Sequence, residues 1–329
     1  GAYVVQVTEE LREVLYLDQA RLVVVDHPEG TEVHSTDKFR PGRPFPRGEI
    51  GTLAQRHPLV KAPRLGGADV TDALNENDGR MVSPSQLRIP QLRGLAEPHG
   101  VVLDFGPLAL NRPLVLALTG WLRFGGGMAN VAASHDPDLP FPFPQLEVET
   151  APDRWQRVDV VAGAPSGKTK TILIDLAGHL PEGARRLRLT TAFEIHWDRI
   201  ALFERQPEDG TRIARFAPAR TDLHWRGYSE FADLPWTQPL TPVYERVRPN
   251  PHWSITPGGW CTRYGAVDEL LAREDNALVL LNGGDELTLS FAAGQLPPVP
   301  AGSRRDFFLA TVGWDKDADF HVELGWKVD

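Results

Sequence analysis

Three polar side chains alternate along one short segment, and their types could perform chemistry together. Glu194, His196 and Asp198 are each separated by one residue in the run Glu-Ile-His-Trp-Asp. Because successive side chains of a strand point to opposite faces, an extended segment would place all three on one face. Two carboxylates and an imidazole so placed could bind a metal ion or a sugar, or act in acid–base catalysis. The alternative, which we favour, is a hydrogen-bonded cluster where a strand meets a loop.

A second group of carboxylates follows Trp314 near the end of the chain. Asp315, Asp317 and Asp319 alternate there, and alternating carboxylates can direct their oxygens onto one calcium ion. An EF-hand loop needs glycine at its sixth position and glutamate at its twelfth, where this chain has Phe320 and Trp326. An extended strand would also place the three aspartates on a solvated edge. A calcium site and a plain polar edge are therefore both open.

Nine tryptophans form a third source of candidate binding residues. An exposed indole ring can stack on the apolar face of a sugar. Trp225, Trp236 and Trp253 lie in an irregular segment and are the candidates for such a surface. Trp121 and Trp197 lie within strongly apolar runs, so we expect them in the core. Packing against the core is the alternative for the first three as well.

Other catalytic and cofactor motifs are absent or incomplete in the sequence. Gly167-Lys168-Thr169 matches the end of a phosphate-binding loop, but Ala162 replaces the earlier glycine and a strand-like run follows. No Gly-x-Ser-x-Gly sequence of a serine hydrolase occurs. The single cysteine, Cys261, excludes an intrachain disulfide and a cysteine zinc site. We expect no nucleotide and no certain cofactor, and calcium is the one candidate ion.

The charge balance and hydropathy limit the classes of partner. A net charge of −9 argues against nucleic acid, which requires clustered Lys and Arg. The densest basic run, 185–188, is interpreted as a solvated strand edge. No apolar run is long enough to cross a bilayer, so no membrane insertion is expected. The chain begins at Gly1 without a signal pattern and ends abruptly at Asp329, so we interpret it as a fragment.

The elements that position these residues are predicted to be strands, because 29 Pro and 30 Gly interrupt helices. Leu187 and Leu189 alternate with Arg186 and Arg188, which indicates one buried and one wet sheet face. Strand-like runs separated by turn residues recur at 3–7, 22–26, 101–105, 114–121, 146–148, 157–161, 171–176, 186–191, 194–203, 277–281, 286–291 and 305–314. This spacing predicts a mostly β protein, in which the run 3–7 is expected to pair with 22–26. We expect an antiparallel β-sandwich or jelly roll, galactose-binding-like, with further β units and few short helices, one at 267–271.

Changes in composition suggest four consecutive segments. Residues 1–95 would form an N-terminal β segment with a Pro/Gly-rich extended loop, and 96–205 the sandwich. The aromatic and Pro-rich segment 206–262 would wrap irregularly around it, since linkers are poor in aromatic residues. Residues 263–329 would form a C-terminal β unit that could complete a sheet with the N-terminal strands.

Seven short sequences together carry a resemblance to a known family. They are Tyr16-Leu17-Asp18 with 22–28, Gly120-Trp121, 165–171, 195–198, Thr262-Arg263-Tyr264-Gly265, Gly284-Asp285-Glu286 and 304–308. In this order they resemble the C-terminal region of large bacterial proteins with FG-GAP (integrin-like propeller) repeats and an ASPIC/UnbV segment, often beside tetratricopeptide repeats. The resemblance spans nearly the whole chain, but the FG-GAP repeats themselves are absent from it. It implies an extracellular, cell-surface or periplasmic location and other domains of a parent protein as partners. It implies no established activity.

These observations favour a non-catalytic β-sandwich module that binds glycan or protein within a larger exported bacterial protein. The alternatives are a carbohydrate-active enzyme with paired carboxylates and a structural scaffold or assembly subunit. A concave pocket with two carboxylates about 5 to 10 Å apart would favour the enzyme. An exposed tryptophan platform would favour sugar binding, and large apolar patches would favour assembly.

Overall fold

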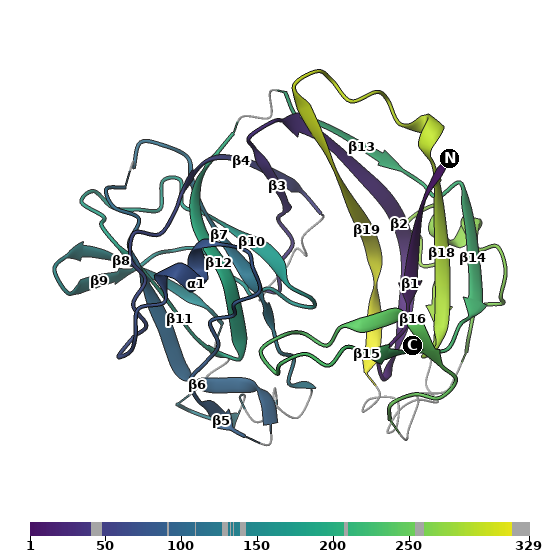
Figure 1. The fold of residues 1–329 in the computed structure, drawn as a ribbon, viewed down its shortest axis with the longest axis horizontal. Helices are drawn as coiled ribbons and strands as arrows, with labels where there is room; N and C mark the ends of the chain where they lie inside the picture. Colours follow the sequence, from purple (N-terminus) through teal and green to yellow (C-terminus); the bar gives the residue numbers. More distant parts are fainter. Residues whose placement is uncertain are drawn as a thin grey trace. The chain divides into compact units, whose positions relative to one another are not determined.

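The chain folds into antiparallel sheets with few helices, as the sequence predicted. Strands make up 52% of the chain and helices 6% (Figure 1). No described helix has both the length and the apolar character needed to span a membrane. The computed structural model describes residues 1–40, 48–90, 92–108, 110–126, 131, 133, 135–138, 143–206, 210–253 and 260–317.

The chain forms two compact units, each assembled from separate stretches of sequence. Unit 1 consists of Gly1–Glu29, Gly210–Asp233 and Leu240–Asp329, and unit 2 of Gly30–Asp209 and Leu234–Pro239. This division differs from the four consecutive segments expected from composition. The reason is that strand pairing joins residues far apart in the chain, which local composition does not reveal.

Unit 1 contains two principal sheets with a shared apolar core. One sheet has the order β1-β18-β14, with bounds Ala2–Thr8, Asp285–Ala292 and Arg220–Trp225. The other is built on β2 (Glu13–Pro28), which pairs with β13, β17 and β19, of bounds Arg212–Phe216, Val279–Leu281 and Ser303–Asp317. A hairpin joins β15 (Tyr228–Phe231) to β16 (Pro242–Arg248). Apolar side chains from both principal sheets and from the 3-10 helix η1 (Asp268–Leu271) form the core.

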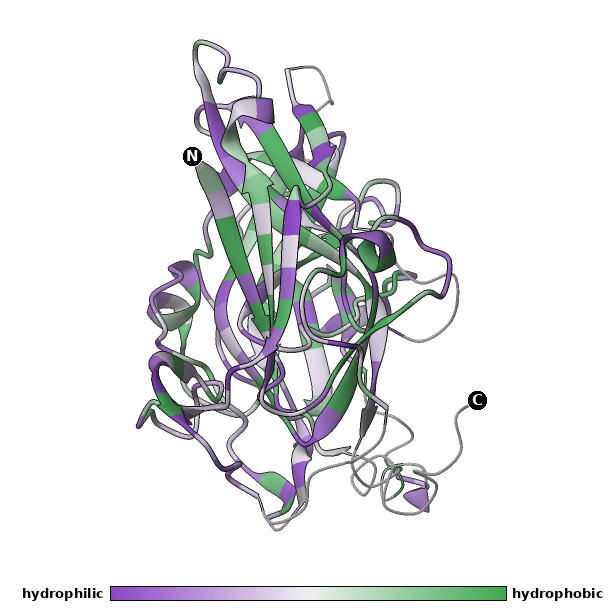
Figure 2. Cartoon of the chain, turned by 90° about the vertical axis from the view of Figure 1, so that its right-hand side faces the viewer, coloured by the Kyte–Doolittle hydropathy of each residue, from purple (hydrophilic) through white to green (hydrophobic). Residues whose placement is uncertain are grey.

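Two expectations about unit 1 are confirmed and one is wrong. The C-terminal strands β17, β18 and β19 complete sheets with the N-terminal β1 and β2, and a short helix lies near 267–271. The run 3–7, however, does not pair with 22–26. Strand β1 pairs with β18, and its Val5 and Val7 pack on the same core as β2 but from the other sheet. Figure 2 shows that β1, which starts at the N label, is hydrophobic over much of its length.

Unit 2 is a sandwich of two five-stranded sheets. One has the order β10-β7-β12-β4-β3, with bounds Lys170–Asp175, Leu114–Leu122, Ile195–Arg205, Ile50–His57 and Glu32–Ser35. The other has the order β5-β6-β11-β8-β9, with bounds Leu87–Ile89, Leu92–Leu103, Leu187–Phe193, Gln145–Ala151 and Arg154–Arg157. Aliphatic side chains from both sheets and from helix α1 (Thr71–Asn75) fill the space between them, including Leu74, Leu103, Leu116, Leu118, Val148, Leu189, Ile200 and Leu202.

Two strand predictions need correction. The segment 206–262, expected to be irregular, contains β13, β14, β15 and β16, which are only four to seven residues long. Strands this short leave little periodicity, although β14 does alternate, with Thr221 and Leu223 buried. The strand expected at 157–161 is instead β9, which ends at Arg157.

The alternation along β11 gives a direct test of the sandwich. Leu189 is buried in the core of unit 2, whereas Thr190 is half-buried and points to the opposite face. We expect Leu189→Ala to lower the free energy of unfolding by about 2 to 5 kcal/mol, because it leaves a cavity. Thr190→Ala should change it by less than about 1 kcal/mol. Denaturant unfolding of both variants measures this, and equal losses would contradict the assignment of the two faces.

Candidate functional site

Glu194 lies where the chain passes from β11 in one sheet of unit 2 to β12 in the other. Its side chain is completely buried, and Arg93 donates to both of its oxygens, from Nε at 3.1 Å and from Nη2. The backbone N–H of Gly94 donates to Oε2 at 2.8 Å. Burial would raise the pKa of Glu194, but His196, Arg93 and Gly94 outweigh it and lower the pKa to about 2. The carboxylate is therefore ionised and already paired.

His196 connects this carboxylate to a hydroxyl group. Its Nδ1 lies 2.8 Å from Ser83 Oγ, and its Nε2 lies 3.4 Å from Glu194 Oε1 without hydrogen-bond alignment. The ring stacks on Trp121 at 4.5 Å and meets the edge of Trp236 at 5.4 Å. An acid, an imidazole and a hydroxyl in this order resemble a nucleophilic triad. Here Arg93 neutralises the acid and two indoles enclose the imidazole, so the arrangement favours a structural role.

Asp198 takes its hydrogen bonds from a turn at Gly79, apart from the partners of Glu194 and His196. A β-bulge between Trp197 and Arg199 inserts Asp198 as an extra residue in β12, which reverses the alternation beyond it. Its Oδ1 accepts from the backbone N–H of Gly79 at 2.9 Å and of Asp78 at 3.2 Å. Burial raises the pKa of Asp198. The side chain thus holds a turn, and the three predicted residues do not form one metal or catalytic group.

Trp236 joins the cluster through the segment Leu234–Pro239. Trp121 Nε1 donates to the carbonyl of Thr237 at 2.9 Å, and Gln238 Nε2 donates to the carbonyl of Gly79 at 2.6 Å. Trp236 is 53% exposed, and the guanidinium of Arg93 lies 5.5 Å from its ring centre. The structure therefore brings Trp236 together with Glu194 and His196, and these contacts hold a short segment on β7 and β12.

The other two candidate tryptophans belong to unit 1. Trp225 ends β14 and is 51% exposed. Trp253 is half-buried and meets the ring of Tyr228 edge-on, with 6.0 Å between the ring centres. Of these two, Trp225 has the exposed ring that a sugar would need.

The aspartates expected to bind calcium lie at the end of β19. Asp315 is exposed and pairs with Leu15, and Asp317 is the last residue of the strand. Asp319 lies outside the described residues. Within the part of the chain that is described, no three His, Cys, Asp or Glu side chains gather as metal ligands. The calcium site stays a prediction.

The outer face of the sheet β5-β6-β11-β8-β9 carries a ladder of charges around one tryptophan. Arg186 binds both oxygens of Glu149 at 2.6 and 2.7 Å, and Arg188 binds Glu147 at 2.6 Å. The guanidiniums of Arg188 and Arg186 lie 4.5 and 5.9 Å from the ring centre of Trp155. Hydrogen bonding from Arg186 lowers the pKa of Glu149. We call Glu147, Glu149, Trp155, Arg186 and Arg188 the outer-face ladder.

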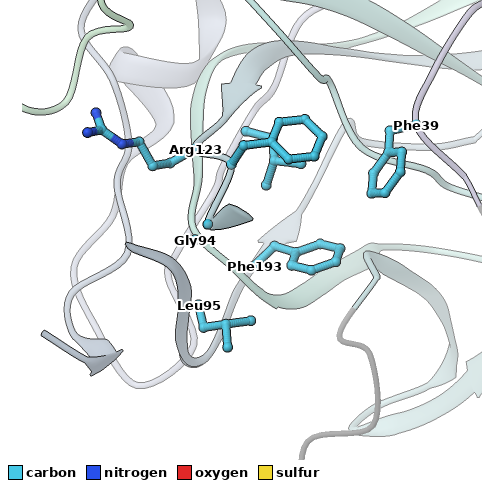
Figure 3. Close-up of a pocket in the computed structure, with 8 residues that line it drawn as sticks. Phe39, Gly94, Leu95, Arg123 and Phe193 are labelled. Carbon is cyan, nitrogen blue, oxygen red and sulfur yellow. The ribbon is translucent and has the colours of Figure 1, made fainter. Parts of the chain in front are cut away.

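The described residues of unit 2 line at least three hollows. An open hollow of about 470 Å³ adjoins the ladder and includes Asp104, Glu149, Arg185 and Arg186 in its lining. A more enclosed cavity of about 80 Å³ lies between β6, β11 and β12. The third, of about 10 Å³, has apolar walls that include Phe39, Leu95 and Phe193, and Figure 3 shows the side chain of Arg123 extending away from these rings. The third has room for no more than a water molecule.

Unit 1 has a buried polar cluster of its own. Glu10 accepts from Arg226, and from the backbone N–H and hydroxyl of Ser229 at 2.8 and 2.6 Å. Arg226 also lies 3.4 Å from Glu286, to which Tyr244 donates at 2.9 Å. The two carboxylates are thus fully engaged by neighbouring donors. This saturation fits a structural cluster that orders the β15–β16 hairpin.

No protein-family model, no curated protein and no solved structure matches the chain. The geometry of the two units is therefore the only basis for a functional argument beyond the sequence resemblance.

The most suggestive groups of unit 2 were not among the sequence candidates. Trp155, Arg64, Ser83 and His99 come from separate stretches that only folding brings to the ladder or to the cavity. For Trp155 a partial signal existed, because the alternation in 186–191 already placed two arginines on the wet face. For the cavity residues the sequence carried no local signal.

Glu9 in unit 1 gives a test of burial through pH. Burial, and then the nearby Glu13, Asp315 and Glu10, raise its pKa from 4.5 to about 8, although the N–H of Leu11 donates to it. The folded state therefore binds a proton that the unfolded chain releases. Stability should fall as pH rises from about 4.5 to about 8, by about 1 kcal/mol per pH unit at most.

Glu9→Gln should remove this contribution, because its amide keeps the shape and the acceptor oxygen without the charge. Urea unfolding across the same pH range should give a flatter profile for Glu9→Gln than for the exposed control Glu274→Gln. Parallel profiles for the two variants would show that Glu9 titrates normally in the folded state.

Proposed function

We propose that the chain is a non-catalytic β-sandwich module that binds glycans through the outer-face ladder and the adjoining open hollow of unit 2. One observation carries the proposal. A half-buried tryptophan, two ion-paired arginines and their glutamates lie together on the outer face of a sheet beside a hollow of about 470 Å³. That volume accommodates at least one sugar ring.

The chemistry of the ladder suits a polyhydroxylated ligand. Guanidinium and carboxylate groups donate to and accept from neighbouring hydroxyls, often in pairs. The ion pairs fix these side chains before a ligand arrives, which lowers the entropic cost of binding. Trp155 supplies apolar area for the C–H face of a sugar. Together these features provide what a sugar needs on a fixed surface.

The ladder is less suited to hydrolysis. A glycosidase of the common type needs one carboxylic acid whose pKa is raised so that it can protonate the leaving group. The pKa of Glu149 is instead lowered, chiefly by its hydrogen bonds with Arg186. Glu147 is likewise held by Arg188. Binding without catalysis therefore fits the local electrostatics better than the enzyme alternative.

We further propose that the module belongs to a larger exported bacterial protein of the FG-GAP and ASPIC/UnbV kind, with neighbouring domains of that protein as partners. The support is the order of the short sequences from Tyr16 to Phe308. An exported protein at the cell surface or in the periplasm would encounter glycans there.

A glycan array tests the proposal, with calcium in one arm and chelator in the other. The wild-type chain should bind a set of glycans, and Trp155→Ala should lower the affinity for them about tenfold or more, as for tryptophans that anchor interfaces. The matched control is Trp225→Ala, which removes an exposed tryptophan from unit 1. Both variants must keep the wild-type melting temperature.

Two results would count against this function. One is an array that stays empty with calcium and with chelator. The other is a control variant that loses as much binding as Trp155→Ala, which would move the binding surface away from the ladder.

A further inference from the structure

The enclosed cavity of about 80 Å³ in unit 2 is built from five regions of the chain. Its lining comes from β6, from β11 and β12, and from the segments 64–65 and 82–85. Leu65, Ser85 and Pro98 are exposed at its rim, so a ligand can enter from solvent. Its volume is about half that of a cavity that holds benzene, which leaves room for about four non-hydrogen atoms.

Backbone contacts hold both segments in place around the cavity. Arg64 bridges to Val101 of β6, and Val82 bridges to Trp197 of β12. The N–H of Leu65 donates to the carbonyl of Gly100 at 2.9 Å. The cavity is therefore formed before any ligand binds.

Its electrostatic character is cationic, although the whole chain carries a net charge of −9. Arg64 Nη1 donates to the carbonyl of Ser83 at 2.7 Å, which fixes the guanidinium at the wall. The described lining residues include no carboxylate, and no described acidic side chain lies within ion-pair distance of Arg64. A half-buried guanidinium without an acidic partner is suited to an anion that enters from solvent.

His99 adds an acceptor to the same lining. Its Nδ1 lies 2.9 Å from the carbonyl oxygen of Glu97, which can only accept, so Nδ1 carries the hydrogen. Nε2 is buried and has no hydrogen-bond partner among the described residues. Burial, and then the nearby Arg64 and His196, lower the pKa of His99 below its usual value, although the carbonyl of Glu97 opposes the shift, so the ring is neutral at pH 7. Nε2 therefore keeps an unused lone pair, but it has almost no solvent-accessible surface in the unliganded cavity, so a donating ligand meets it only when the ring or the rim shifts.

We propose that this cavity is a binding site for a small hydroxycarboxylate. The carboxylate pairs with Arg64, and the neighbouring hydroxyl donates to Nε2 of His99. The hydroxyls of Ser83 and Ser85, which also belong to the lining, can donate to the carboxylate oxygens. A carboxyl group, its α-carbon and one hydroxyl are five non-hydrogen atoms, slightly more than the enclosed volume holds, so the outermost atom and the rest of any larger ligand extend past the rim.

The same chemistry occurs in two sources, a free hydroxy acid and the carboxylated end of an acidic sugar. The site is separate from the outer-face ladder and does not depend on it. A failure of glycan binding at Trp155 would leave this proposal intact, and the reverse also holds.

The test is titration calorimetry of the full chain with sodium glycolate, sodium acetate, galacturonic acid and galactose. Glycolate should bind more tightly than acetate, which lacks the hydroxyl, and galacturonic acid more tightly than galactose, which lacks the carboxylate. Arg64→Gln should weaken glycolate about tenfold or more. The matched control Arg154→Gln removes an exposed arginine of β9 and should leave the affinity unchanged.

His99→Gln separates the two contacts. It should reduce the affinity for glycolate to that for acetate while leaving acetate unaffected, a pattern that general unfolding would not produce. The proposal is overturned if glycolate gives no saturable heat, if Arg64→Gln and Arg154→Gln weaken it equally, or if galactose binds as well as galacturonic acid. Tighter binding of galacturonic acid than of glycolate identifies the sugar as the source, and the opposite order identifies the free acid.

Discussion

The packing of two sheets face to face is the constraint on which the rest of unit 2 depends. Aliphatic side chains from both sheets fill most of the space between them, and the enclosed cavity lined by β6, β11 and β12 takes up only about 80 Å³. Most polar side chains therefore lie on the outer faces of the sheets, at the sheet edges and in the loops. Strands β7 and β12 are exceptions, since their residues are buried on both faces, and the polar side chains of β12 must find partners inside the protein. Glu194 meets this requirement by binding Arg93, and His196 by binding Ser83. Asp198 does so by accepting from the turn at Gly79.

The same constraint explains why alternation in the sequence was informative in some places and misleading in others. Along β11, Leu187 and Leu189 point inward and the arginines outward, as two-residue periodicity predicts. Along β12 the pattern fails after Trp197, because a bulge adds one residue and shifts Asp198 out of register. The sequence alone gives no sign of that bulge, since it is a response to pairing with β7. Local patterns thus predicted the type of element well and the relation between elements poorly.

The pairing of distant segments was beyond sequence reasoning for a similar reason. Strand β1 pairs with β18, nearly the whole length of the chain away, and the enclosed cavity joins residues from position 64 to position 197. No local property of Arg64 or His99 indicates that they share a cavity. The candidate tryptophans show that side-chain exposure was also hard to predict from the sequence. Exposure was expected for three, yet Trp253 is half-buried, and the tryptophan with the most suitable partners, Trp155, lies in a regular strand.

The central claim is that unit 2 binds glycans on an outer sheet face, which its packed interior holds rigid. Hydrogen–deuterium exchange with and without a glycan identified on the array tests this most directly. The account predicts slower exchange at amides of β8, β9 and the start of β11, with unit 1 unchanged. Protection confined to unit 1 strands, or spread evenly over the core strands β7 and β12, would contradict it.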